Sequence, residues 1–155
     1  MASTGSSFRT MSANSRLTIG AHALAWLALA QRRGRPVLTS DEVAASVRTN
    51  PVVIRRRLGE LHRAGLVEVR RGAGAGWSLA RPADRITLLD VYTAVEHDPI
   101  FAMHPGEPNP ECPVGRGIRP ALRAVYGDVE AVLRRQLAGT SIAALLDRIM
   151  GTERK

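Results

Sequence analysis

Residues 66–82, "LVEVRRGAGAGWSLARP", place two arginines beside three alternating glycines, between two short apolar segments. Both segments, "LVEV" and "WSLA", alternate their side chains in the manner of β-strands. The glycines between them permit the positive φ angles of a tight connection. A dinucleotide-binding glycine loop would instead open a helix after its strand, whereas a second strand follows these glycines. The stretch therefore predicts a β-hairpin with arginines near its tip.

Three helices are predicted before this hairpin. The first covers residues 15–31 and is apolar nearly all round, so it should be buried on most sides. The second begins in "LTSDEVAASV", where Thr39 or Ser40 can cap it. The third runs from Pro51 to about residue 64, because proline suits the first turn of a helix. The tripeptide "RTN", residues 48–50, makes a tight connection between the second and third helices.

The third helix has two different faces. Ile54, Leu58 and Leu61 fall in one narrow stripe at about 100° of rotation per residue. Arg57 lies at the margin, where its stem can pack while its guanidinium reaches water. The opposite face carries cations and small residues, namely Val52, Arg55, Arg56, Gly59 and Arg63. Two helices joined by a tight turn, the second with a basic outer face, form a helix-turn-helix, and a hairpin directly after it is a wing. A solvated charged face on an ordinary helix bundle stays open as the alternative.

The net charge of +8 is confined to the first part of the chain. Residues 1–90 hold 14 arginines and 6 acidic residues, whereas residues 91–155 hold 8 basic and 8 acidic residues. This asymmetry favours a nucleic acid or another acidic surface as the partner of the N-terminal part. A charge that served only solubility would not need to be segregated in this way.

The C-terminal part begins with a helix in "ITLLDVYTAVEHD", for which Thr87 is the predicted cap. A 17-residue loop with five prolines follows at residues 97–113. Loops of this length are uncommon in compact domains and are often functional. A long helix is expected from about residue 116 to residue 137, with Pro120 in its first turn. A last amphipathic helix follows Gly139.

The long helix carries a seam with alternating spacings of four and three residues, which suits a partner helix. The seam consists of Ile118, Leu122, Val125, Val129, Val132 and Gln136, five of which are apolar. Packing within its own domain is the alternative. We favour a dimer seam, because the preceding domain contains enough elements to form a core of its own.

These patterns indicate a mainly α fold with a small β-hairpin wing: a winged helix-turn-helix plus a long C-terminal dimerisation helix. We expect a flexible N-terminal tail (1–14), a winged-helix DNA-binding domain (15–96), a proline-rich sensor-type loop (97–115) and dimerisation helices (116–155). No run of about 18 apolar residues could span a membrane, and the polar start of the chain is unlike a secretion signal. With Cys112 as its single cysteine, the chain fits the reducing cytoplasm.

Several of these segments resemble the Rrf2 family of bacterial transcription regulators, the IscR/NsrR type of winged-helix protein. The resemblance spans roughly residues 12–149 and rests on "HALAWLALA", on "LTSDEVAASVRTNPVVIRRRLGEL" and on the later "ECPVG". Its most specific part is "AGLVEVRRGAGAGWSLARP" followed by "ITLLDVYTAVE", which is similar to the family's glycine-rich wing tip and the helix after it. The resemblance implies a homodimer with a long dimerisation helix that binds a two-fold-related DNA operator.

The resemblance also implies roles for individual residues. The wing arginine that matches Arg71 would enter the minor groove. Four residues would face the major groove: Asn50, Val52, Val53 and Arg55. From the helix face alone, Arg55 and Arg56 are the best candidates for reading a guanine. The full set of candidate DNA-binding residues is Thr49, Asn50, Val52, Val53, Arg55, Arg56, Arg70, Arg71 and Gly74.

The chain departs from the iron–sulphur members of the family in the proline-rich loop, where those members carry three cysteines. A cluster needs about four ligands, which a single Cys112 per subunit cannot supply, so no cofactor is expected. The helix that follows Cys112, together with Arg116, would favour a thiolate, whereas Glu111 would oppose it. A redox sensor is one interpretation of Cys112, and an inert, partly buried cysteine is the other, which we favour. The remaining loop residues match no known metal signature: His97, Asp98, His104, Glu107 and Glu111.

We therefore predict a cytoplasmic transcription regulator, acting as a repressor, that binds double-stranded DNA as a homodimer through the helix near residues 116–137. It should contact no membrane and should respond to a small signal molecule or an oxidant. The alternative is a winged-helix subunit that assembles proteins without reading DNA. An enzyme ranks last, because no nucleophile–base pair, metal site or nucleotide loop survives its sequence context.

Overall fold

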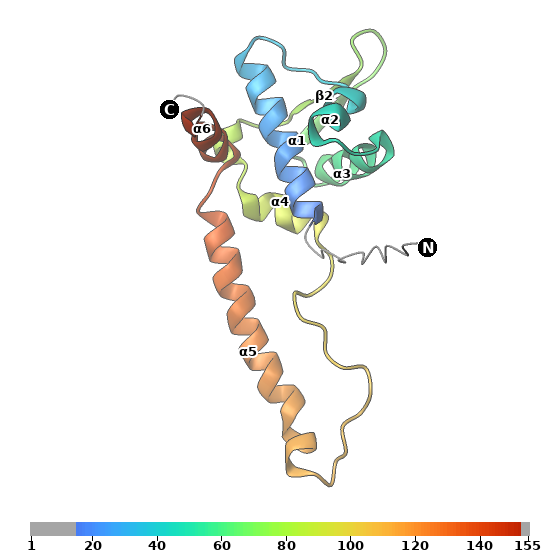
Figure 1. Ribbon diagram of the computed structural model, residues 1–155, viewed down its shortest axis with the longest axis vertical. Coiled ribbons are helices and arrows are strands. Elements are labelled where there is room, and N and C mark those ends of the chain that lie inside the picture. Colours follow the sequence, from blue (N-terminus) through green and yellow to red (C-terminus); the bar gives the residue numbers. More distant parts are fainter. Residues whose placement is uncertain (1–14, 153–155) are drawn as a thin grey trace, which may run out of the picture.

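The computed structural model describes residues 15–152, in which the chain forms six α-helices, one 3₁₀ turn and one two-stranded antiparallel sheet. Figure 1 shows a cluster of short elements from which one long helix, α5 (Pro113–Ala138), projects. The predicted tail, residues 1–14, lies outside the described residues. No helix in residues 15–152 is long and apolar enough to cross a membrane.

The predicted helix-turn-helix is formed by α2 (Ser40–Val47) and α3 (Pro51–Arg63). Thr39 caps α2 through a reciprocal capping box, in which its hydroxyl accepts a hydrogen bond from the Glu42 amide and the Glu42 carboxylate accepts one from the Thr39 amide. The chain reverses at Arg48, whose left-handed φ of 60° ends α2. Local bonds therefore fix the start of α2 and the turn toward α3.

The predicted wing is an antiparallel hairpin of β1 (Val67–Arg70) and β2 (Gly76–Leu79). Its root is fastened to the segment before α2, where the backbones of Leu38 and Trp77 exchange two hydrogen bonds of 2.8 and 3.0 Å. Gly76 permits this close approach, because a Cβ there would lie 2.5 Å from the Leu38 carbonyl oxygen. The hairpin is therefore held by two parts of the chain rather than by α3 alone.

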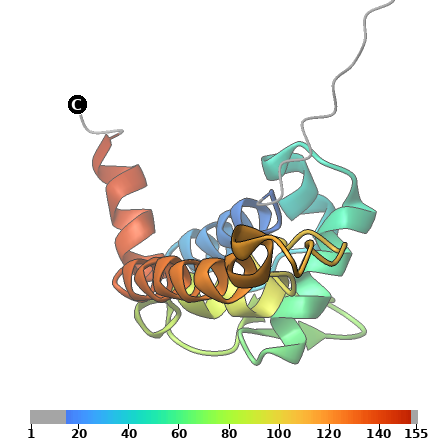
Figure 2. The same ribbon diagram turned by 90° about the horizontal axis from the view of Figure 1, so that it is seen from below.

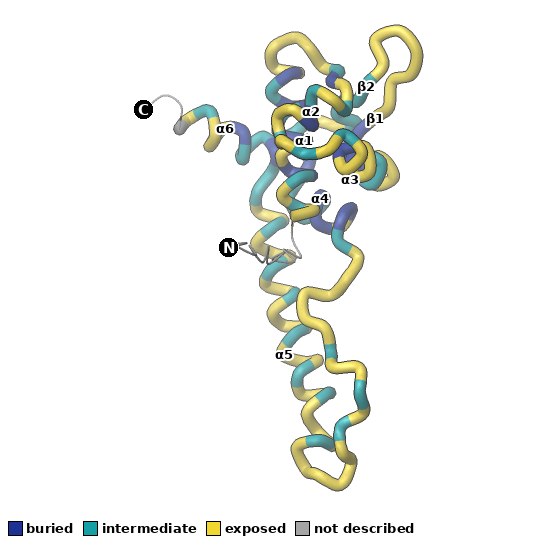
Figure 3. Tube along the Cα trace, turned by 45° about the vertical axis from the view of Figure 1, so that its right-hand side comes forward, coloured by how far each residue is buried: buried dark blue, intermediate teal, exposed yellow. Residues whose placement is uncertain are grey.

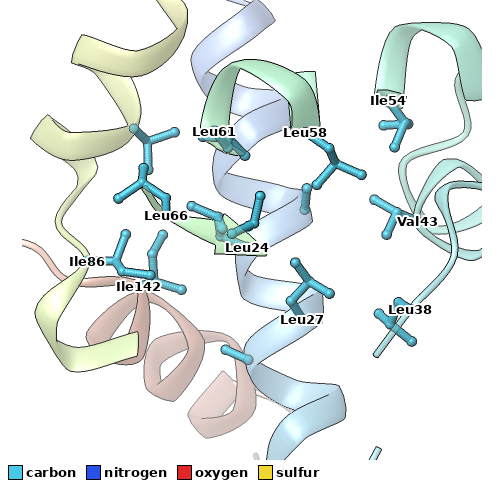
Figure 4. Packing of buried hydrophobic residues seen from close by; sticks show 14 of the residues in the cluster. Leu24, Leu27, Leu38, Val43, Ile54, Leu58, Leu61, Leu66, Ile86 and Ile142 are labelled. Carbon is cyan, nitrogen blue, oxygen red and sulfur yellow. The ribbon is translucent and has the colours of Figure 1, made fainter. Parts of the chain in front are cut away.

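The core is built around α1 (Ser15–Arg32), which packs against α3, α4 (Leu88–Val95) and α6 (Ile142–Thr152). Leu24 and Leu27 of α1 are fully buried among side chains from these helices (Figure 4). Burial of a leucine side chain stabilises a fold by about 1.5–3 kcal/mol. Packing in the core thus explains why α1 is apolar on one of its sides, the side that faces the core.

The last helix returns to this core after the long excursion through α5. Ile142 and Leu146 of α6 are buried, and the Ile142 amide donates to the Ile86 carbonyl oxygen at 2.8 Å. An exposed ion pair of 2.9 Å between Arg32 and Asp147 joins α6 to the end of α1. Seen from below, α6 projects to the side away from α2 and α3 (Figure 2).

The long helix begins three residues before its predicted start, so Pro120 lies inside it rather than in its first turn. The reason is local: Pro113 has no amide hydrogen and takes the first helical position, with Cys112 as the N-cap. None of the 26 residues of α5 is buried, and a helix of this length spans about 39 Å. Most of α5 therefore extends beyond the core, and the proline-rich loop runs back beside it (Figures 1 and 3).

Candidate nucleic-acid interface

The two predicted faces of α3 are confirmed by their burial. Ile54, Leu58 and Leu61 are fully buried, whereas Val52 is 62% exposed. The arginines predicted on the outer face are exposed as well, at positions 55, 56 and 63. Base edges in a DNA groove accept both apolar and guanidinium side chains, so the exposed face of α3 suits such a groove.

The prediction that the Arg57 head reaches water was wrong. Its side chain is 7% exposed and pairs with Glu60, itself 11% exposed, at 3.1 Å. Burial lowers the pKa of Arg57 below its ordinary value, and the neighbouring Glu60 carboxylate offsets part of that effect. The head turns inward because a carboxylate three residues along the same helix gives it a buried partner. Arg57 therefore belongs to the core side of α3 and is not available to DNA.

The turn before α3 is built by Asn50. Its side-chain oxygen accepts a hydrogen bond of 2.8 Å from the Val52 amide, which makes it the N-cap of α3. This places the half-buried Thr49 and the exposed Asn50 at the start of the helix, beside the exposed Val52 and Val53. Because the Asn50 oxygen is used within the chain, only its amide group is left to donate to a base or a phosphate.

The tip of the wing is a fully exposed turn. Residues 71–75 are all exposed, and Gly72 and Gly74 have left-handed φ angles of 79° and 72°. No atom lies within 4 Å of the position that a Cβ would take at Gly74. The tip therefore has the free space around its backbone that a close approach to DNA requires. Arg70 and Arg71 stand at its start, both exposed.

The arginines of this surface differ from the five described arginines that form ion pairs. Ion pairs hold Arg32, Arg35, Arg57, Arg119 and Arg134. Within residues 15–152, no carboxylate lies in ion-pair range of the predicted DNA-binding arginines: Arg55, Arg56, Arg70 and Arg71. Both α3 and the hairpin lie on the same side of the domain, away from α6 (Figures 1 and 3). Other arginines of residues 15–152 also make no ion pair, among them Arg33, Arg81 and Arg135, but those of α3 and the wing lie where a helix and a hairpin could meet one duplex (Figure 1).

His62 and Trp77 link α3 to the wing; the sequence places His62 near the wing but does not predict its contact with Trp77. The His62 ring bonds to the Val67 carbonyl oxygen through Nδ1 at 3.0 Å. The same ring meets Trp77 edge to face, with ring centroids 6.4 Å apart. The Trp77 indole in turn donates to the Ser40 hydroxyl at 3.0 Å. This series of contacts connects α3, both strands and α2. An aromatic residue at the start of β2 is the only sign of it in the sequence.

The proline-rich loop is held to α5 by contacts within the chain. The Arg119 guanidinium donates to the Glu107 carboxylate at 3.0 Å and to the carbonyl oxygens of His104 and Gly106. The rings of Phe101 and Tyr126 pack with their centroids 4.9 Å apart. One arginine and one aromatic pair therefore give this loop a defined path.

Cys112 is exposed, so the interpretation as a partly buried cysteine was wrong. The cause is its place as the N-cap of α5 at the far tip of the molecule, where nothing in the described chain covers it. Its role as a redox sensor stays a prediction. In residues 15–152, no three His, Cys, Asp or Glu side chains lie close enough to share a metal ion.

A sequence model of the Rrf2 family, described as "Iron-dependent Transcriptional regulator", matches residues 13–148 of the chain. YwnA of Bacillus subtilis, whose name describes an HTH-type transcriptional regulator, is 35% identical over 137 residues, which are 88% of this chain and 98% of YwnA. The HTH-type transcriptional regulator IscR of Cereibacter sphaeroides is 40% identical over 84 residues, 54% of each protein.

Solved structures show the same architecture. A crystal structure described as that of a DNA-binding protein is 32% identical and superposes with a TM-score of 0.67, over 84% of this chain and 98% of the other. Staphylococcus aureus CymR is 21% identical, with a TM-score of 0.63 over 86% and 96% of the two chains. The IscR of T. potens, also 21% identical, gives a TM-score of 0.64 over 87% and 85%.

Proposed function

The chain belongs to the Rrf2 family of transcriptional regulators, and from this premise we propose that it is a homodimeric, sequence-specific repressor that works without an iron–sulphur cluster. The observation that carries the proposal is the set of unpaired arginines shared by α3 and the wing. Cations without carboxylate partners are free to neutralise phosphates, which supplies much of the affinity of a protein for DNA.

The outer face of α3 enters the major groove in this proposal. Arg55 and Arg56 donate to guanine, and a good bidentate pair discriminates against the wrong base by about 1–3 kcal/mol. Val52 and Val53 offer apolar contact to thymine methyl groups. Asn50 faces the same groove through its side-chain amide group, and Thr49 binds the DNA backbone at the helix start, where amide groups favour a phosphate.

The wing follows the adjacent minor groove. Arg71 inserts where a narrow groove concentrates negative potential, and Arg70 binds the flanking phosphates. Because Gly74 has no side chain, the backbone of the tip can enter the minor groove between the two phosphate backbones of the DNA. The hydrogen bonds between Leu38 and Trp77 support this role, because they fix the strands that carry Arg70 and lead to Arg71, so these arginines lose less freedom on binding.

A homodimer is supported by the exposed seam of α5. Val125 and Val132 are 55% and 57% exposed, and Ile118 and Val129 are exposed as well. Apolar stripes of this length on a soluble helix indicate a protein partner. Two copies related by a two-fold axis would place their α3 helices on half-sites about one helical turn of DNA apart.

The description of the family as iron-dependent does not fit the donor set of this chain. Cys112 is the only thiol in the sequence, and the part of the chain that the structure describes brings no three metal-ligating side chains together. Thiolate clusters need about four ligands. Contacts of Arg119 already order the loop. We therefore propose no regulatory step that uses iron. We also propose that the protein acts in the cytoplasm as a regulator of transcription.

Repression is the mode we assign, because a dimer that occupies an operator excludes the polymerase from an overlapping promoter. A reporter fused to the region upstream of the gene should rise when the gene is deleted. Cys112 is the candidate group for an oxidant signal, and the variant Cys112→Ser should then bind DNA normally while losing any response to mild peroxide. A response that survives in Cys112→Ser removes the thiol from the proposal.

The deciding experiment is selection of sites from random duplex DNA by the purified protein. We expect enrichment of a two-fold sequence, and Arg55→Ala should relax the preference at one base position by about 5–150-fold, the equivalent of 1–3 kcal/mol. Arg135→Ala removes an exposed arginine of α5 and is the matched control. No enrichment of any sequence would instead favour a winged-helix subunit that assembles proteins.

A further inference from the structure

Two residues on the outer face of α3 have no assigned role in the proposed interface. Gly59 and Arg63 lie in the C-terminal half of the helix, on the face that also carries Arg55 and Arg56. Residues three and four positions apart in a helix are neighbours on its surface. Gly59 therefore has three arginines around it, with Arg55 and Arg56 before it and Arg63 after it.

Gly59 is an unfavourable residue for its position. Glycine in a helix interior is destabilising relative to alanine, because it loses more backbone freedom on folding. Gly20 of α1 has a packing reason, since a Cβ there would lie 2.9 Å from Cγ1 of Val91. A Cβ at Gly59 would meet only Nη1 of Arg63, at an ordinary contact distance of 3.7 Å. Packing within the described chain thus gives no reason for the missing side chain.

Arg63 is exposed, and its guanidinium lies close to this bare stretch of helix. No carboxylate of residues 15–152 is within ion-pair range of it. The one acidic residue of α3, Glu60, pairs instead with the buried Arg57. A positive charge without an acidic partner therefore stands where the surface of the helix is open.

The wing leaves α3 directly after these two residues. Helix α3 ends at Arg63, and β1 begins four residues later at Val67. The His62 ring bonds to the Val67 carbonyl oxygen at 3.0 Å and so holds the start of the hairpin against the end of the helix. The corner between α3 and the hairpin is therefore fixed, and Gly59 lies about one helical turn from it.

The shape of a duplex determines what must occupy this corner. One sugar–phosphate backbone separates a major groove from the minor groove beside it, and the two grooves are about 12 and 6 Å wide. In the proposed function α3 lies in the major groove and the tip of the wing in the adjacent minor groove. The backbone between those grooves must then cross the corner between helix and hairpin, past the C-terminal half of α3.

We propose that Gly59 and Arg63 form a seat for this DNA strand. Gly59 lets the sugar–phosphate backbone approach the helix, and the planar guanidinium of Arg63 donates to one phosphate. Contacts to phosphate fix the register of a protein on a duplex but carry no sequence information. The seat therefore positions Arg55 against its base without reading a base itself. This inference rests on the proposed function and adds two positioning residues to it.

A side chain at position 59 tests the close approach. Gly59→Ala should raise the midpoint of thermal unfolding by about 2–4 °C, because alanine favours the helix, and it should nevertheless weaken DNA binding. Gly59→Leu should weaken binding to every duplex by about tenfold or more, because it displaces the strand from a charge-assisted contact. The ranking of sequences should not change. Ala124→Leu, at an exposed position of α5 outside the seam, is the matched control and should bind as the wild type does.

The charge of the seat has its own test in duplexes that carry one uncharged methylphosphonate in place of a phosphate. Along the selected operator, the wild type should lose about tenfold in affinity when the modified position is the backbone between the two grooves. Arg63→Ala should bind the unmodified operator about tenfold more weakly and lose nothing further at that position. Arg135→Ala, which removes an exposed arginine of α5, should keep the wild-type pattern of losses.

The outcomes separate this inference from the proposed function. A wild-type protein that binds no duplex and selects no sequence overturns both. Binding that depends on Arg55 and Arg71 but is unchanged in Gly59→Leu overturns the seat alone. So does a changed ranking of sequences in Gly59→Leu, or a methylphosphonate pattern that is the same in Arg63→Ala and the wild type. Far-ultraviolet circular dichroism checks that each variant folds.

Discussion

Apolar residues are buried in the core around α1 but are not buried in the arm formed by α5. In the core, side chains such as Leu24 and Leu58 are fully buried within one chain. In the arm, none of 26 residues is buried, although the seam is mostly valine, leucine and isoleucine. One chain is thus enough to bury the apolar residues of the first region, whereas the seam of α5 stays uncovered within one chain. In the proposed homodimer, a second chain would cover it. The difference predicts which substitutions will affect folding and which will affect assembly.

The largest effect is expected in the core. Leu58→Ala should lower the free energy of unfolding by about 2–5 kcal/mol, because it removes a fully buried side chain and leaves a cavity. Val52→Ala, on the exposed face of the same helix, should change it by less than about 0.5 kcal/mol. Urea denaturation followed by circular dichroism measures both. Equal losses in the two variants would contradict the assignment of the two faces of α3.

The arm should respond in assembly rather than in folding. Val129→Asp places an unpaired carboxylate in the seam, and we expect dimerisation to weaken by about 100-fold or more, since such a buried charge costs several kcal/mol. Ala124→Asp, an exposed position outside the seam, is the control and should leave the dimer intact. Sedimentation velocity over a range of concentrations reads the association, while circular dichroism follows the core. Loss of the core in Val129→Asp would show that the two regions are not independent.

The DNA-binding surface offers a smaller effect that leaves both regions folded. Arg71→Ala should weaken binding to every duplex and make the slope of log Kobs against log salt shallower by about one unit, because one phosphate-neutralising cation is lost. Arg55→Ala should instead change the ranking of sequences. Fluorescence anisotropy at several salt concentrations distinguishes the two. An unchanged affinity for Arg71→Ala at low and high salt would remove the wing from the interface.

The smallest effect concerns the cap of α2. Hydrogen bonds from the Thr39 amide and from Arg35 hold the pKa of Glu42 below its ordinary value of 4.5. The charge of Glu42 therefore stabilises the fold fully above that ordinary value, and the contribution is lost as the pH falls through the lowered pKa. Glu42→Gln keeps the capping geometry and should cost about 0.3–1 kcal/mol at pH 7.

That difference should shrink toward zero in acid. Chemical denaturation at neutral and acidic pH measures it, with Glu68→Gln as an exposed carboxylate on β1 for comparison. A cost that stays constant across this range would mean that the charge of Glu42 has no part in the cap.

Features with local causes could be predicted from the sequence, and features with distant causes could not. The stripe of Ile54, Leu58 and Leu61 follows from helical periodicity alone, and the hairpin follows from its glycines. The burial of Arg57 depends on its ion pair with Glu60 and on the helices around it. Helical periodicity contains neither contact, so it predicted that the guanidinium would reach water. The predicted start of α5 was three residues late, because the sequence pattern places Pro113 in the loop, although proline equally suits the first turn of a helix.

The packing of α6, the helix that follows the arm, could not be predicted from the sequence either. The last helix is amphipathic, which predicts that one face is covered but not by what. Its packing on α1 follows from the return of the chain after α5, with Ile142 bonded to Ile86. Contacts of His62 and Trp77 join residues 15 positions apart, and no period or motif links those two positions.

The return of α6 onto α1 has a mechanical consequence. The arm leaves the core through the loop after α4 and re-enters it through α6, so both of its attachments sit on helices that pack against α1. A rod anchored at one end converts rotation into displacement: a tilt of about 5° over roughly 39 Å moves the free end by about 3 Å. In a two-fold pair, the pitch of the two rods would set how far apart the two reading helices stand. A chemical event that shifts the root of α5 would therefore change the spacing of DNA half-sites that the protein tolerates.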